Sequence, residues 1–215
     1  MADLPYRDRS EAGRVLATRL AHWRGAPGLL VLGLPRGGVP VAAEVAHALA
    51  APLDVFVVRK LGYPGAPEVA MGAIASGGVR VVAPLPGMPV DPVDVERVAA
   101  RELEELQRRE LLYRGGRLPL QLAGRSVIVV DDGLATGASL LAAARAVRSA
   151  GPLRLCAAVP VGSSEGCELV RPAVDELVCP AIPMPFRAVS LWYRHFPQTS
   201  DAEVRSLLAR AGPAP

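Results

Sequence analysis

Two adjacent carboxylates, Asp131 and Asp132, directly follow an uninterrupted apolar run at residues 126–130. The run is rich in β-branched side chains, and its lack of alternation is typical of a strand buried on both faces. Charged side chains cannot remain inside such a sheet, so we expect both acids at its carboxyl edge, where open α/β sheets bind their ligands. Carboxylate oxygens in that position can accept hydrogen bonds from the hydroxyl groups of a sugar.

The small, hydroxylated segment after the acids could bind a phosphate group. An alanine- and leucine-rich stretch predicts a helix over about residues 138–150. A glycine-containing turn at the start of a helix presents free N–H groups and the positive end of the helix dipole. The candidate phosphate-binding residues are Ala135, Thr136, Gly137, Ala138 and Ser139. A plain turn followed by helix-capping hydroxyl groups explains each residue singly, but not the combination.

A second candidate anion site follows the apolar run at residues 29–34. This predicted strand leads into Arg36, Gly37 and Gly38 and then into a predicted helix over about residues 39–50. A glycine turn that contains an arginine and opens a helix suits a phosphate group. The alternative is a tight turn whose glycines adopt positive φ angles.

A third candidate is the pair Arg59 and Lys60, which follows a predicted strand at residues 53–58. Two cations at the carboxyl end of a strand suit a diphosphate. Lys60 is the only lysine of the chain, which suggests that a compact ammonium group is required there. The Gly- and Pro-rich residues 61–78 then predict a long flexible loop, with a short strand at 71–75 paired to 79–82 and with Glu68 as its notable charge.

The apolar strand, the two acids, the short spacer, the Thr-Gly pair and the hydroxyl residue together resemble the signature for 5-phosphoribosyl 1-diphosphate (PRPP) in the type I phosphoribosyltransferases. The resemblance implies an α/β fold, with a parallel sheet flanked by helices, a small hood and a flexible catalytic loop that would contain Glu68. It makes the chain a single domain, with a core at about residues 29–179 and a hood formed by about residues 1–25 and 180–215.

The implied reaction is displacement of diphosphate from C1 of PRPP by a nitrogen nucleophile, such as a nucleobase or a related heterocycle. Asp131 and Asp132 would hold the ribose hydroxyls, the segment from Ala135 to Ser139 the 5-phosphate, and the glycine turn with Arg59 and Lys60 the diphosphate. Mg²⁺ would bridge the diphosphate and the ribose hydroxyls, without an assigned protein ligand. The 6-oxopurine branch has an acid where this chain has Ala135, which disfavours hypoxanthine and guanine and leaves the acceptor open.

Four of the nine aromatic residues lie between 186 and 196, where prolines forbid regular structure. Because the hood selects the base in the resembled family, Trp192, Tyr193 or Phe196 could stack on an acceptor ring. The same rings could instead form the small core of the hood itself.

Elsewhere, periodicity predicts helices at residues 10–23, 91–113, 164–170 and 200–211 and strands at 153–161 and 174–179. This alternation is typical of a parallel sheet.

Bulk properties exclude several classes of protein. The net charge of +3 is mild and the basic residues are dispersed, which does not call for a nucleic-acid partner, and no apolar run is long enough to span a membrane. We therefore expect a soluble, cytoplasmic protein. The three cysteines show no C-x-x-C spacing and indicate neither a disulfide framework nor a zinc site. The absence of asparagine suits a thermophile, although coding bias would leave the same trace.

Two other functions fit parts of the pattern. A regulatory protein could use the same fold to sense PRPP or a nucleotide without catalysis, but it would not need the diphosphate turn and Lys60. A phosphorelay receiver domain also has paired acids at a strand end, but near its first strand. The partners we expect are PRPP and a small-molecule acceptor, with a homodimer as the common assembly of such folds.

Overall fold

A parallel sheet of five strands lies at the centre of the fold. The computed structural model describes residues 4–82, 87–115 and 119–211. In spatial order the strands are β2 (Leu53–Val55), β1 (Leu30–Gly33), β6 (Ser126–Val130), β7 (Arg154–Ala158) and β8 (Glu176–Val178), and each pairs in parallel with its neighbours. The alternation of strands and helices in the sequence therefore predicted the fold class correctly.

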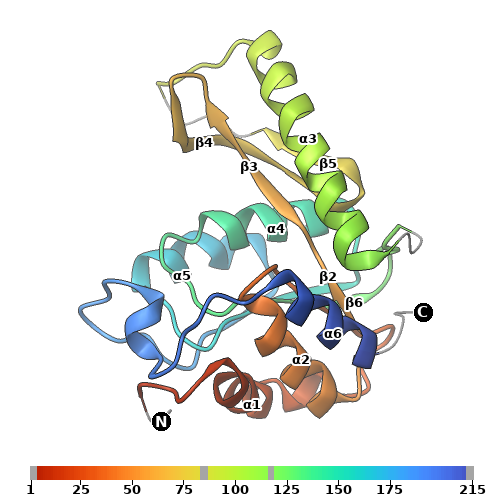
Figure 1. The fold of residues 1–215 in the computed structure, drawn as a ribbon, viewed down its shortest axis with the longest axis vertical. Coiled ribbons are helices and arrows are strands. Elements are labelled where there is room, and N and C mark those ends of the chain that lie inside the picture. The colour runs from red at the N-terminus through yellow and green to blue at the C-terminus, as the bar shows by residue number, and fades with distance from the viewer. Residues whose placement is uncertain (1–3, 83–86, 116–118, 212–215) are drawn as a thin grey trace.

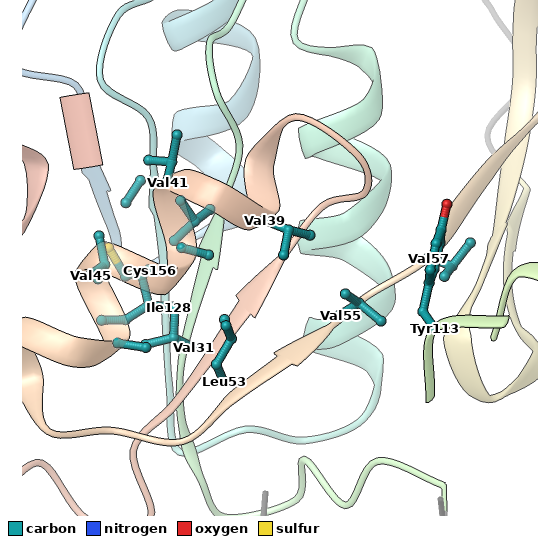
Figure 2. Close-up of a cluster of buried hydrophobic side chains, with 14 of the residues drawn as sticks. Val31, Val39, Val41, Val45, Leu53, Val55, Val57, Tyr113, Ile128 and Cys156 are labelled. Carbon is teal, nitrogen blue, oxygen red and sulfur yellow. The ribbon is translucent and has the colours of Figure 1, made fainter. Parts of the chain in front are cut away.

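Helices cover both faces of this sheet (Figure 1). On one face lie α1 (Arg9–Arg19) and α2 (Gly38–Leu49), and on the other lie α4 (Ala138–Ser149) and α5 (Ser164–Val170). Successive residues of β6 consequently enter different cores, Ile128 with α2 and Val129 with α4. Figure 2 shows part of the first core. Because both faces are covered, β1 and β6 are buried along their whole length, which explains their continuous apolar runs.

A second, antiparallel sheet projects from the first one and corrects the predicted loop (Figure 1). It consists of β3 (Val58–Tyr63), β4 (Ala66–Ala75) and β5 (Val79–Val82), in that order, and packs against α3 (Pro92–Arg114). The predicted pairing of residues 71–75 with 79–82 is confirmed, but residues 61–78 are mostly paired strand instead of an irregular loop. Glycine serves close backbone approach here, since a Cβ at Gly72 would lie 2.4 Å from the carbonyl oxygen of Val81.

The predicted strand at residues 53–58 is also wrong in its extent. β2 ends at Val55, and the chain crosses to the second sheet, where the backbone and hydroxyl of Ser76 bind Val57. Arg59 and Lys60 therefore lie inside β3, not at the carboxyl end of a strand of the parallel sheet. The hydrogen bonds between Val57 and Ser76 join residues 19 positions apart in the chain, and residues 55–58 are all apolar with no turn residue that would mark the change of sheet.

The predicted hood region brings both ends of the described chain together. Residues 6 and 7 run beside residues 192–195, with hydrogen bonds from the Tyr6 amide to the Trp192 carbonyl and from the Arg194 amide to the Tyr6 carbonyl. Helix α6 (Asp201–Ala211) follows, capped by the Ser200 hydroxyl. Short 3₁₀ helices complete the fold: η1 (Ala21–Trp23), η2 (Ser76–Gly78), η3 (Arg171–Ala173) and η4 (Val189–Trp192). None of the helices in the described ranges has the length and apolarity of a membrane span.

Candidate functional site

The acid pair, Asp131 and Asp132, lies directly after β6, at the carboxyl edge of the parallel sheet, as expected from the sequence. The glycine turn, residues 35–38, lies against it because it follows the neighbouring strand β1. A Cβ at Gly37 would lie only 2.0 Å from Oδ2 of Asp132, and a Cβ at Gly38 only 2.6 Å from the carbonyl oxygen of Val130. Two motifs that are far apart in the sequence thus form one site.

Glycine is required in this turn because a side chain would collide with neighbouring atoms, and not because of the backbone conformation. Gly37 has φ −63° and ψ −31°, which any residue can adopt, so the interpretation as a turn with positive φ angles is wrong for it. The Leu34 amide bonds the Val130 carbonyl at 2.9 Å, which joins the turn to the end of β6. The peptide bond between Pro35 and Arg36 is cis.

Arg9, which opens α1, is a site residue that the sequence analysis missed. Its Nε donates to Oδ2 of Asp132 at 2.8 Å, and both side chains are largely buried, with 10% and 16% of their surfaces exposed. The guanidinium also lies over the ring of Phe196, 3.7 Å from the centroid. An arginine at the start of an N-terminal helix carries no sequence signal for a partner so far along the chain.

Both acids of this pair have raised pKa values, which disfavours the state in which both are ionised. Burial and the charge of Asp132 raise the pKa of Asp131 well above its usual range. Burial also raises the pKa of Asp132, while Arg9 opposes that shift. Oδ1 of Asp131 accepts the Asp132 amide at 2.9 Å. Hydrogen-bond donors from a sugar, or a cation brought by a ligand, would stabilise the charged form of such a pair.

The loop that follows the acids, residues 135–139, opens α4 as predicted. Gly137, with φ +82°, is the residue before the helix, and Ala135, Thr136 and Ser139 are exposed around it. The hydroxyl of Ser163 donates to the Ala135 carbonyl at 2.5 Å and accepts the Gly166 amide at 2.9 Å. This serine fixes the loop from the neighbouring strand-to-helix turn. Its capping position before a short helix is a signal that the sequence analysis left unused.

The predicted diphosphate cations are not gathered at one place. A guanidinium nitrogen of Arg36 lies 3.8 Å from a carboxylate oxygen of Asp201 in α6, while Arg59 pairs with Glu102 of α3 at 2.7 Å. Lys60 is exposed in β3. Only Arg36 belongs to the turn that contacts the acid pair. Glu68 lies in β4, and its side chain is outside the described residues.

The aromatic residues proposed for acceptor stacking have different environments. Tyr193 is buried, packs against Tyr6 and Phe196, and donates its hydroxyl to the Asp132 carbonyl. It therefore contacts the acid pair through the backbone and presents no free face. Trp192 is half-buried, stacks on Phe186, and its indole nitrogen has no partner among the described residues.

Metal binding by the protein alone has no obvious centre. Within the described ranges, no group of three or more His, Cys, Asp or Glu side chains could hold an ion. The oxygen atoms of the acid pair are of the kind that Mg²⁺ prefers, but they fall short of a cage.

Comparison with known proteins matches the chain to the model of the phosphoribosyl transferase domain over residues 13–190. The chain is 49% identical over 206 residues to a Mycobacterium tuberculosis protein named "Putative phosphoribosyl transferase Rv0571c". The alignment covers 95% of this chain but 46% of that protein, so the chain spans about half the length of the curated relatives it matches.

The chain is also similar to two further proteins. An orotate phosphoribosyltransferase of Mycobacterium avium is 29% identical over 165 residues, which are 77% of this chain and 65% of that protein. The crystal structure of TT1426 from Thermus thermophilus superimposes with a TM-score of 0.88 at 43% identity, covering 97% of this chain and 99% of that one. The whole fold described above is therefore shared with a solved structure.

Proposed function

Because the chain belongs to the phosphoribosyl transferase domain family, we propose that it is an enzyme that transfers the 5-phosphoribosyl group of PRPP to a nitrogen nucleophile. The observation that carries the proposal is the contact between the glycine turn and the acid pair, with the exposed loop before α4 following the acids. The three features offer a diphosphate site, a ribose site and a phosphate site in the order in which PRPP presents these groups.

In this proposal each feature has one role in binding. Asp131 and Asp132 accept hydrogen bonds from the ribose hydroxyls. The N-terminus of α4, with the hydroxyls of Thr136 and Ser139, binds the 5-phosphate. The glycine turn binds the diphosphate through its backbone and Arg36. Mg²⁺ enters as part of the substrate, bound to PRPP, and supplies neutralising charge for the leaving group.

The chemical step needs no covalent bond to the protein. The bond from C1 to the diphosphate oxygen breaks, the diphosphate leaves with the electron pair, and the nucleophilic nitrogen forms the new bond to C1. The charge that develops on the sugar ring is close to the acid pair, so positioning and electrostatic stabilisation carry the rate. Ala135 supplies no acid to a purine ring, which favours acceptors other than hypoxanthine and guanine.

The test is release of diphosphate from PRPP and Mg²⁺ across a panel of purine, pyrimidine, pyridine and simple amine acceptors. We expect release that depends on one acceptor and is lost in Asp132→Asn, while Asp175→Asn, a change to an exposed acid outside the site, keeps the activity. Tight binding of PRPP with no turnover for any acceptor would contradict the proposed enzymatic activity and favour a sensing role.

A further inference from the structure

Arg9 is fixed by three contacts from different parts of the chain. Its Nε bonds Oδ2 of Asp132 at 2.8 Å, a second guanidinium nitrogen bonds the Pro197 carbonyl at 2.7 Å, and its plane covers the Phe196 ring. With 10% of its side chain exposed, the guanidinium is held and desolvated. A guanidinium is well suited to this position, because it can stack and donate at the same time.

The contacts of Asp132 leave one side of its carboxylate available. Oδ2 accepts a hydrogen bond from Arg9 and lies against Gly37, where a side chain on residue 37 would collide with it. The backbone carbonyl of Asp132 accepts a hydrogen bond from the Tyr193 hydroxyl. Oδ1 accepts no hydrogen bond from another residue in the part of the chain that the structure describes. Arg9 therefore sets the orientation of the carboxylate from one side, and the other oxygen is free to accept a hydrogen bond from a ligand.

The charges around the pair give Arg9 a second effect. The groups that face Asp132 are Asp131 on its own segment, Arg9 from α1 and Tyr193 from the hood region, while Gly37 adds no charge. Of these, Arg9 is the only cation, and its charge opposes the rise in pKa that burial causes in both acids. Without it, the two adjacent acids would have no cation in contact with them among the residues that the structure describes.

We propose that Arg9 is a positioning residue that acts through Asp132, holding Oδ2 so that Oδ1 is presented to a ribose hydroxyl of PRPP. This inference rests on the proposed function and assigns to the N-terminal helix a role that the resemblance to the family did not imply. Arg9 itself does not touch the substrate. Its effect on binding must therefore vanish when the carboxylate is absent.

A double-mutant cycle with Mg²⁺–PRPP as the titrant tests this inference. We expect Arg9→Gln to weaken binding about tenfold or more, in line with loss of a hydrogen bond to a charged group, and to cause less than about a twofold further loss in an Asp132→Asn background. Arg9→Lys should recover part of the affinity, because it keeps the charge. The matched control is Arg14→Gln, since Arg14 also lies in α1 but pairs with Glu44 on the surface. We expect it to bind like the unmodified protein.

Equal losses for Arg9→Gln in both backgrounds would show that Arg9 contacts PRPP itself and would overturn the inference while leaving the proposed function intact. Failure of the unmodified protein to bind PRPP would instead overturn the proposed function. A second measurement tests the contact between Arg9 and Asp132 without PRPP. It is a carboxyl-carbon NMR titration of Asp131 and Asp132. Arg9→Gln should raise the Asp132 titration midpoint, and an unchanged midpoint would refute the coupling between the two side chains.

Discussion

Gly37→Ala is a test of whether the two motifs form one packed site. Gly37 already has a backbone conformation that alanine adopts freely, so the change adds a methyl group and no backbone strain. That methyl carbon would lie 2.0 Å from Oδ2 and 2.7 Å from Cγ of Asp132, and 3.3 Å from Nε of Arg9. Contacts of this kind below 3.0 Å are essentially never observed, so the carboxylate must move by about 1 Å.

The cost has two parts. Insertion of a methyl group into a packed site typically costs about 1–3 kcal/mol. A shift of the carboxylate also lengthens its 2.8 Å bond to Arg9, and hydrogen bonds to charged groups contribute about 1.5–3 kcal/mol. Because the site can relax in part, we expect Gly37→Ala to lower the free energy of unfolding by about 2–4 kcal/mol. PRPP binding should weaken in parallel, since the displaced carboxylate is the proposed ribose acceptor.

Urea unfolding and PRPP titration measure the two effects. The control is Asp132→Ala, which removes the atoms that the new methyl group would meet. In that background Gly37→Ala should cost about 1 kcal/mol or less, so the two changes are strongly non-additive. A Gly37→Ala protein with the stability and PRPP affinity of the unmodified chain would refute the packing described for this site.

Four further predictions concern the charges of acidic side chains and the hydrogen bonds that support the site. Asp131→Asn should raise the free energy of unfolding near neutral pH and not at acid pH, because a folded-state pKa above the unfolded one contributes stability that is lost as the pH rises through it. Asp175→Asn should lower the free energy of unfolding near neutral pH and not at acid pH, because Arg148 lowers the pKa of Asp175 in the folded protein. Urea unfolding near neutral pH and at acid pH measures both effects. Ser163→Ala should cost about 1–2 kcal/mol in urea unfolding and weaken binding of ribose 5-phosphate, and equal binding would contradict its support of the loop. Tyr193→Phe should lower the free energy of unfolding by about 1 kcal/mol in urea unfolding. It should shift the NMR titration midpoint of Asp132 by no more than Arg9→Gln does.

The sequence predicted the centre of the fold because local patterns determine it. The continuous apolar runs of β1 and β6 require helices on both faces, and the residues after each run are forced to the same edge of the sheet. The contact of Gly37 and Gly38 with the acid pair follows from that geometry. For the same reason the start of α4 and the capped start of α3 lie where periodicity predicted them.

Residues that depend on tertiary contacts could not be predicted in this way. Residues 55–58 are all apolar and include no turn residue, yet the chain leaves the parallel sheet after Val55, and hydrogen bonds between Val57 and Ser76 join it to a second sheet that contains Arg59 and Lys60. Arg9 reads as an ordinary helix-opening residue until the fold brings it to Asp132. The sequence shows an aromatic cluster at residues 186–196, but only the structure shows that Tyr193 is buried against the acid pair.

The central claim is that the edge of the sheet formed by β1 and β6 binds PRPP. Calorimetric titration with Mg²⁺–PRPP tests it most directly, with ribose 5-phosphate and diphosphate as separate competitors. We predict one site per chain that each competitor displaces in part, with binding weakened about tenfold or more by Asp132→Asn and retained by Asp175→Asn. Absence of binding, or equal binding by the Asp132→Asn protein, would contradict the account.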